Sequence, residues 1–249
     1  MRNTMVLVVC LFVGCMQLYA QNNSVDTLKK VKPTYWKSLI VPTVLISFGT
    51  IGTYNKHLNH INLELREEVN EHIDEGITID DFTQFVPSLS VYALNMAGIK
   101  GKSAFWKRTT VLATATLIMG SSVLTLKNNT QILRPDGSST NSFPSGHTAT
   151  AFMGAEFLRQ EYKDISCWYG VAGYMVAAGT GLFRIYNNRH WLTDVATGAG
   201  IGILSTRIAY WVYPLMEKVA SKSGRKTNSA LLLPFYQQGS LGVSFSLKL

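Results

Sequence analysis

Six apolar segments, each bounded by charged residues, limit the possible folds of this chain more than any other feature. They cover residues 38–54, 85–99, 109–126, 148–158, 165–183 and 195–216. The third, fifth and sixth are close to the roughly 20 residues that a helix needs to cross a bilayer. The other three are shorter, and each suits a buried core helix as well as a membrane helix. The pattern predicts an all-α, polytopic membrane helical bundle.

The overall composition agrees with a membrane protein and narrows the possible partners. Only 15% of the 249 residues are charged, against about 25% in an average soluble domain. The formal net charge of +8 suits nucleic acid, anionic lipid or a phosphate-rich substrate. The sequence has no basic stripe with interleaved aromatic residues, so we expect no nucleic acid partner. The length fits one domain.

The regions outside the apolar segments carry signals of their own. Residues 1–20 combine a basic residue, an apolar stretch and the small residue Ala20, which is typical of a cleavable secretory signal peptide. After cleavage Cys167 is the one cysteine left, and we expect it to be buried as a small apolar residue. Residues 55–84 are polar and acidic and are expected to form a helix outside the bilayer. Alternating apolar residues near the end of the tail, 217–249, predict a short β-hairpin.

The distribution of lysine and arginine predicts how the segments are oriented. The short loop between the second and third segments carries four basic residues: Lys100, Lys102, Lys107 and Arg108. Short basic loops stay on the cytoplasmic side, so the loops 127–147 and 184–194 are expected to share the outer face. A cleaved signal peptide conflicts with six alternating spans. Either the leader is retained or segment 38–54 does not cross the membrane.

The two predicted outer loops contain cations, histidine and aspartate at short spacings. Lys127 and Arg134 lie in the first loop with six residues between them. In the second loop five residues separate Arg184 from His190, and three more separate His190 from Asp194. Because His190 and Asp194 are four residues apart, they share one face of a helix. The carboxylate can then hold one imidazole nitrogen while the other acts as a nucleophile or base.

The segment PSGH at residues 144–147 adds a second histidine, His147, directly before an apolar helix. Backbone N–H groups at a helix start form an anion site, here at Ser145 and Gly146. Both histidines and Asp194 are also possible metal ligands, but the three neighbouring cations would repel a divalent ion. The same cations suit a tetrahedral phosphate, because Arg offers two parallel donors and Lys a point charge.

Together these spacings resemble the motif of the type 2 phosphatidic acid phosphatase (PAP2) family, which is related to the vanadium haloperoxidases. That motif consists of Lys-x6-Arg-Pro, Pro-Ser-Gly-His and Ser-Arg-x5-His-x3-Asp, and the chain matches all three parts in order and spacing apart from the serine of the third. Phe183 stands where the family usually has a small residue. The resemblance covers about 85–216. It divides the chain into a signal peptide (1–20), an N-terminal segment (21–84), a phosphatase core (85–216) and a tail (217–249).

The resemblance implies a metal-independent phosphatase that uses no cofactor. His147 is expected to protonate the leaving oxygen. His190, oriented by Asp194, is expected to attack phosphorus and form a phosphohistidine that water hydrolyses. The residues expected to hold the phosphate oxygens are Lys127, Arg134, Arg184, Ser145 and Gly146.

Lipid A dephosphorylation is the activity that the loop sequences favour. They look most like those of bacterial lipid A phosphatases, particularly those acting on the 4′-phosphate. We therefore expect a phosphorylated lipid substrate at the periplasmic face of a bacterial inner membrane, with resistance to cationic antimicrobial peptides as a consequence. Undecaprenyl diphosphate and phosphatidylglycerophosphate are alternative substrates. A vanadate-binding haloperoxidase and a non-catalytic protein that binds anionic lipid are alternatives of other classes. The sequence leaves the oligomeric state open.

Overall fold

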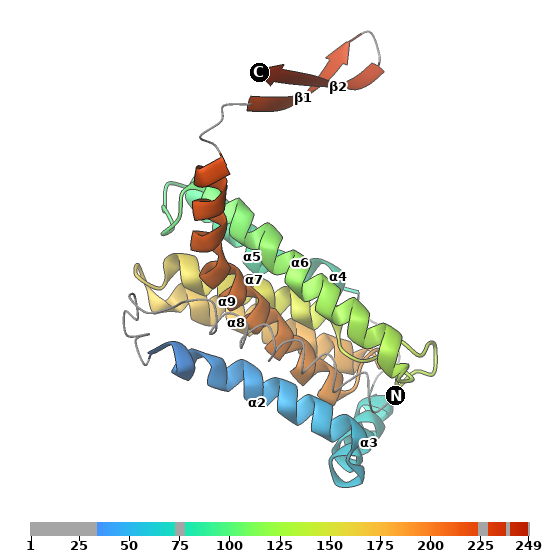
Figure 1. Ribbon diagram of the computed structural model, residues 1–249. Helices are drawn as coiled ribbons and strands as arrows, with labels where there is room; N and C mark the ends of the chain where they lie inside the picture. Colours follow the sequence, from blue (N-terminus) through green and yellow to red (C-terminus); the bar gives the residue numbers. More distant parts are fainter. Residues whose placement is uncertain (1–33, 73–77, 224–228, 238–239, 249) are drawn as a thin grey trace, which may run out of the picture.

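The computed structural model describes residues 34–72, 78–223, 229–237 and 240–248, so the predicted signal peptide lies outside the described residues. Figure 1 shows a bundle of helices followed by a hairpin. The elements are α2 (Thr34–Tyr54), α3 (Lys56–His72), α4 (Asp80–Thr83), α5 (Val86–Met96), α6 (Phe105–Thr130), α7 (Gly146–Tyr162), α8 (Cys167–Tyr186), α9 (Leu192–Ser223), β1 (Ser229–Gln237) and β2 (Ser240–Lys248). Each predicted apolar segment overlaps one helix, which confirms the helical fold class.

The tail forms the hairpin that its alternating pattern predicts. Strands β1 and β2 pair antiparallel, from Ser229 opposite Lys248 to Gln237 opposite Ser240. In Figure 1 the hairpin follows the long helix α9. It is the one sheet in the described part of the chain.

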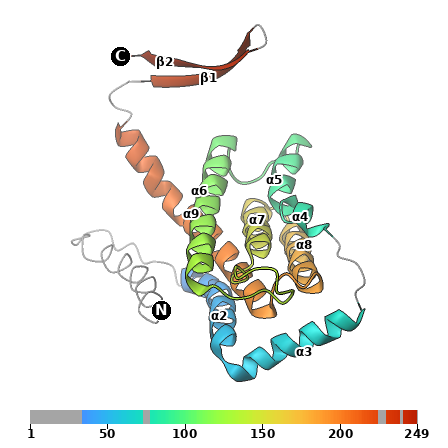
Figure 2. The same cartoon turned by 90° about the vertical axis from the view of Figure 1, so that its right-hand side faces the viewer.

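Helix α7 is the central helix of the bundle. It packs against α5, α6, α8 and α9, and Figure 2 shows it between α6 and α8. Apolar side chains along it, from Ala149 through Met153 and Phe157 to Tyr162, are buried in the main core cluster. The segment that begins with the PSGH motif is therefore held on several sides by other helices.

Two glycines four residues apart, Gly198 and Gly202, let α9 approach α7 very closely. A Cβ atom at Gly198 would lie 2.5 Å from the backbone oxygen of Ser145, and one at Gly202 would lie 2.2 Å from that of Ala149. Both distances are too short for any side chain. The start of α7 and the first turns of α9 are thus fixed to each other by direct backbone contact.

Buried ion pairs explain how the central helix tolerates two glutamates. Glu156 accepts hydrogen bonds from Arg159 at 2.8 and 2.7 Å and from Arg207 at 2.9 Å. Glu161 lies 3.5 Å from Arg108. Both carboxylates are almost fully buried, and buried charges persist in proteins when they are paired in this way.

The polar region 55–84 forms two helices, and both of them contact the bundle. Asn62 in α3 donates a hydrogen bond of 3.1 Å to the hydroxyl of Thr193, at the start of α9. The short helix α4 packs on α7 and α8, and its Asp80 is buried. The prediction of a helix in this region is confirmed for α3, but no sequence pattern indicated the contacts made by α4.

The structure differs from two predictions: the membrane-spanning character of α8 and α9, and the burial of Cys167. By length and composition alone, α6 is the one described helix that is long and apolar enough to cross a membrane. We expected the segments within α8 and α9 to be comparable with α6, but these helices are not both long and apolar enough to cross a membrane. The prediction that Cys167 is buried is wrong. Cys167 is exposed because it is the first residue of α8, before the buried positions of that helix that begin at Gly170.

Candidate active site

The two loops predicted to share one face do meet at one end of the bundle. The indole N–H of Trp191 donates to the backbone oxygen of Leu133 at 2.9 Å. The backbone N–H of Ser145 donates to the backbone oxygen of Asp194 at 3.1 Å. In Figure 2 the end of α6, the start of α7 and the junction of α8 and α9 lie together at this end. Every residue of the three motif clusters therefore belongs to one region.

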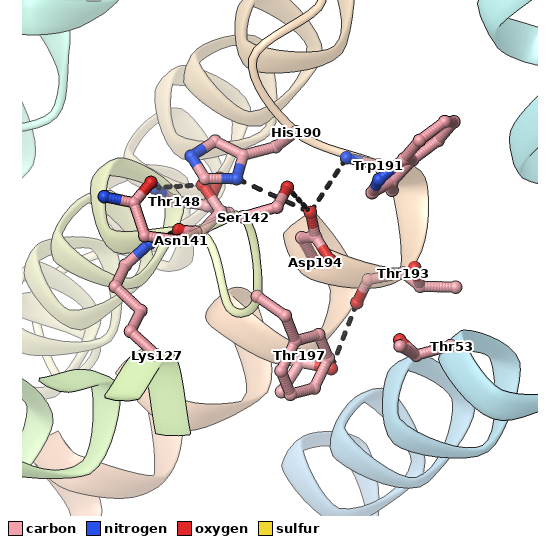
Figure 3. A network of polar contacts seen from close by, with 12 residues as sticks. Thr53, Lys127, Asn141, Ser142, Thr148, His190, Trp191, Thr193, Asp194 and Thr197 are labelled. Carbon is pink, nitrogen blue, oxygen red and sulfur yellow. Dashed lines mark hydrogen bonds and ion pairs between the residues drawn. The ribbon is translucent and has the colours of Figure 1, made fainter. Parts of the chain in front are cut away.

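His190 and Asp194 form a buried pair within this region (Figure 3). The His190 Nδ1 atom lies 3.5 Å from Asp194 Oδ2, and the two side chains are 2% and 0% exposed. This distance is at the long limit for a hydrogen bond, and Nδ1 has no closer partner among the described residues. The pairing leaves Nε2 as the nitrogen able to react with a substrate.

Two donors fix the carboxylate that holds His190. The hydroxyl of Ser142 donates to Asp194 Oδ2 at 2.5 Å, and the backbone N–H of Trp191 donates to the same oxygen at 3.0 Å. Figure 3 shows both contacts converging on Asp194. Ser142 was not among the predicted site residues. The signal that could have found it is its place two residues before the PSGH motif.

The surroundings keep the His190 imidazole neutral at physiological pH. The pKa of His190 is lowered to about 4, mainly by burial and also by the positive charges of Lys127 and Arg184, while Asp194 opposes the shift. Only the neutral ring carries the nitrogen lone pair that a nucleophile needs. The same two cations that lower this pKa are predicted phosphate ligands.

Two of the three predicted cations have a buried donor without a partner in the described part of the chain. The Nζ atom of Lys127 donates to the backbone oxygen of Asn141. Among the described residues, the Nε–H groups of Arg134 and Arg184 are buried without a hydrogen-bond partner. Burial, together with the charges of Arg184 and Arg189, lowers the pKa of Arg134. Buried, unpaired donors on clustered cations are costly, and an anion with several oxygens would satisfy them.

The start of α7 supplies further donors, although the Ser145 side chain is already in use. Its oxygen accepts a hydrogen bond of 3.4 Å from the backbone N–H of Thr148, and the two hydroxyls lie 2.9 Å apart. Ser145 therefore caps the helix. The N–H groups of Gly146 and His147 lie in the first turn, where no carbonyl of the helix can accept them. They stay available for an anion, and a direct phosphate contact by the Ser145 hydroxyl stays a prediction.

Two aspartates from α4 enter the site, and sequence reasoning missed both. Asp81 Oδ1 lies 2.8 Å from His147 Nε2. Asp80 accepts a hydrogen bond of 2.6 Å from Arg184 and one of 3.2 Å from Asn187. In the sequence the two aspartates belong to an acidic stretch that has the pattern of a solvated surface, so nothing marked them as site residues.

The cluster of Asp80, Asp81 and His147 has the ligand atoms of a small metal site, all within 4.8 Å of one another. Its surroundings fit a cation poorly. Both oxygens of Asp80 already accept hydrogen bonds, one of them from the Arg184 guanidinium. A divalent ion would have to displace that cation or lie beside it. The donor set of the region as a whole fits an anion.

The site residues coincide with a known family signature. Residues 122–217 match the family model of the PAP2 superfamily. This part of the chain, on the helical fold described above, is therefore similar to the PAP2 superfamily. The match includes Lys127, Arg134, His147, Arg184, His190 and Asp194.

Individual proteins are also similar to parts of this chain. A lipid A 1-phosphatase of Porphyromonas gingivalis is 45% identical over 139 residues, which are 55% of this chain and 31% of that protein. The chain thus spans about a third of the length of this curated relative. The crystal structure of LpxE from Aquifex aeolicus shares 26% identity and a TM-score of 0.47, covering 61% of this chain and 95% of that one. A phosphatidylglycerolphosphate phosphatase of the PAP2 type from Bacillus subtilis shares 20% identity and a TM-score of 0.47, covering 72% and 97%.

Proposed function

We propose that the protein is a metal-independent phosphatase that removes a phosphate monoester from a membrane lipid. One observation carries this proposal. A buried, neutral His190, oriented by Asp194, lies near cations, and the buried Nε–H groups of Arg134 and Arg184 have no partner among the described residues. A nucleophile beside an anion site is the minimum that phosphoryl transfer to a side chain needs.

The proposed reaction has two steps. In the first, Nε2 of His190 attacks phosphorus, the bond between phosphorus and the lipid oxygen breaks, and His147 gives its proton to that oxygen. In the second, water attacks the phosphohistidine, His147 takes a proton from the water, and phosphate leaves while His190 is regenerated. Lys127, Arg134 and Arg184 would stabilise the charge on the transferred group in both steps.

The surface of the bundle supports a membrane location. Large apolar side chains are exposed on several helices: Ile40, Val44, Leu89, Met96, Leu117, Leu124, Met175 and Leu182. So much exposed apolar surface is unusual for a protein in water. Trp106 and Trp168 are also exposed, at the starts of α6 and α8, and exposed Trp is typical of a membrane interface. We infer that the bundle lies in the bacterial inner membrane, with the site at its periplasmic end.

Lipid A is the substrate that we place first. The relative from Porphyromonas gingivalis is a lipid A 1-phosphatase, whereas the loop sequences of this chain suggested the 4′-phosphate. That relative puts the 1-phosphate ahead of the 4′-phosphate as the bond to test. Undecaprenyl diphosphate and phosphatidylglycerophosphate are the competing substrates, since the proposed chemistry would be the same for either.

The test is phosphate release by the purified full chain in detergent. The panel holds lipid A with both phosphates, undecaprenyl diphosphate and phosphatidylglycerophosphate, and mass spectrometry of the lipid A product locates the lost group. We expect fastest turnover of lipid A, activity in the presence of a chelator, and none in His190→Ala. Release from the other lipids alone would exclude lipid A. Full activity in His190→Ala would overturn the mechanism.

A further inference from the structure

The proposed mechanism does not use the contacts that α4 makes with the general acid His147 and the phosphate ligand Arg184. Asp81 lies 2.8 Å from His147, and Asp80 lies 2.6 Å from Arg184. Asp81 and His147 are 66 positions apart in the chain, and Asp80 and Arg184 are 104 positions apart. Asp80 and Asp81, which are adjacent in α4, thus each contact one side chain of the candidate site.

The position of α4 is fixed by contacts other than these two. The hydroxyls of Thr83 and Thr180 are hydrogen-bonded at 2.9 Å, and Asn187 donates to the second oxygen of Asp80 at 3.2 Å. Asp80 is 1% exposed. The Asp81 carboxylate is therefore presented to His147 by an anchored element, and the contact is not a chance pairing of two mobile surface groups.

The pair of Asp81 and His147 repeats the arrangement of Asp194 and His190. In each pair a carboxylate contacts one nitrogen of an imidazole and leaves the other nitrogen free. The pairs differ in the nitrogen that is contacted, Nδ1 in His190 and Nε2 in His147, and in burial, because the His190 pair is almost fully buried, whereas Asp81 is about half exposed. The exposed pair suits a histidine that must exchange protons with water in every cycle.

We propose that Asp81 is a positioning residue for the general acid, which holds His147 through Nε2 so that the protonated ring presents its Nδ1–H to the leaving oxygen. Asp80 is the matching positioning residue for Arg184. This inference rests on the proposed function. It adds α4, outside the PAP2 match at residues 122–217, to the catalytic apparatus.

The charges around His147 agree with this role. Asp81 and Asp80 face it from α4, and Arg184 faces it from α8. Burial and the Arg184 guanidinium lower the pKa of His147, while both carboxylates oppose the shift and favour the protonated imidazole. By pairing with Arg184, Asp80 also offsets the charge that opposes protonation of His147. Without α4, the general acid would face a cation alone.

The test compares Asp81→Asn with the unchanged full chain on two kinds of phosphate monoester. A lipid or alkyl phosphate needs a proton on its leaving oxygen, whereas p-nitrophenyl phosphate does not. A general acid contributes about 10²- to 10⁴-fold, so loss of its orientation should lower kcat/KM for the alkyl substrate by about 10- to 100-fold. Turnover of p-nitrophenyl phosphate should be spared, which also shows that the variant is folded.

The pH profile supplies a readout that a purely structural role would not affect. Removing the carboxylate disfavours the protonated ring, so the pH above which activity on the alkyl substrate falls should move down in Asp81→Asn. Asp81→Glu should restore part of the activity. The matched control is Asp164→Asn, since Asp164 is an exposed carboxylate paired with Lys102 at 3.8 Å, and both activity and profile should be unchanged there.

Double variants separate this inference from the proposed function. In a His147→Ala background, Asp81→Asn should have no further effect. Three outcomes would each overturn the positioning role: an equal loss of activity on both substrates in Asp81→Asn, higher activity in that variant, or a need for an added divalent metal. If His147→Ala and Asp81→Asn both keep full activity on alkyl substrates, the proposed mechanism fails. If only Asp81→Asn keeps it, the mechanism stands and the role of α4 is wrong.

Discussion

His190 combines two properties at the residue scale that a free histidine lacks: a fixed orientation and a low proton affinity. The first comes from Asp194, itself held by Ser142 and Trp191. The second comes mainly from burial, with help from neighbouring cations. Both come from residues contributed by different elements, so the reactivity of the ring is a property of the fold.

The low pKa of His190 gives a direct prediction. With a pKa of about 4, against about 6.5 for an unperturbed histidine, the ring should stay neutral when the pH is lowered from 7 to 5 and take up a proton only near pH 4. Nitrogen NMR of histidine-labelled protein in detergent, with His190→Ala to assign the signal, measures this. A titration midpoint near 6.5 would contradict the burial that the structure shows.

Ser142 should be important although it is not among the proposed phosphate ligands. Its hydroxyl donates to the carboxylate that orients His190, and a hydrogen bond to a charged group contributes about 1.5–3 kcal/mol. We expect Ser142→Ala to lower kcat/KM by about 10- to 100-fold, in line with that energy. Steady-state kinetics checks this, with Ser121→Ala on the exposed surface of α6 as control. Equal activity of the two variants would show that Ser142 does not support Asp194.

The sequence predicted the site residues that lie within spaced motifs and missed the others. Lys127, Arg134, Arg184 and both histidines stand at fixed intervals that chemistry can interpret. Ser142 has no such interval, and Asp80 and Asp81 lie in an acidic stretch of ordinary appearance. Their roles depend on where α4 packs, which no local pattern encodes.

At the scale of elements, close contact between α7 and α9 holds the two halves of the site together. The spacing of Gly198 and Gly202 made this contact predictable, because small residues four apart let helix backbones approach each other. The pairing of α4 with α7 and α8 was not predictable, since a four-residue helix carries no periodic pattern. The exposure of Cys167 was missed for a similar reason: composition does not show which residue of a helix lies beyond its packed stretch.

A matched pair of glycine variants tests the contact. In Gly202→Ala the new Cβ would lie 2.2 Å from the backbone oxygen of Ala149, so the helices must separate, at a cost of about 1–3 kcal/mol or more. Gly179→Ala places its Cβ in open space and should be neutral or stabilising by up to about 1 kcal/mol. Thermal unfolding in detergent and activity measure both. Equal stability of the two variants would refute the close packing.

At the scale of the whole molecule, the bundle places its chemistry at one end and its basic loop at the other. The site lies where α6 and α8 end, and Lys102 and Lys107 lie where α6 begins. Short basic loops stay on the cytoplasmic side. This polarity predicts that the site faces the periplasm, where lipid A phosphates would be within reach.

Cysteine labelling of intact cells tests this orientation. In a variant without the three native cysteines, single cysteines are placed at Thr140, in the exposed part of the site loop, and at Ala104, exposed just before α6. An impermeant maleimide should label Thr140→Cys from outside, and Ala104→Cys only after the membrane is opened. The reverse pattern would place the site in the cytoplasm and exclude a periplasmic substrate.

The central claim is that His190 carries the phosphate during the reaction, and trapping that intermediate tests it most directly. The purified protein is mixed with lipid A labelled in its phosphates, quenched in base, in which phosphohistidine survives, and digested for mass spectrometry. We expect the label on the peptide that contains His190, its removal by acid, and its accumulation in His147→Ala when a phosphate ester with a good leaving group is used. Turnover of lipid A without any label on His190, or label on another residue, would contradict the account.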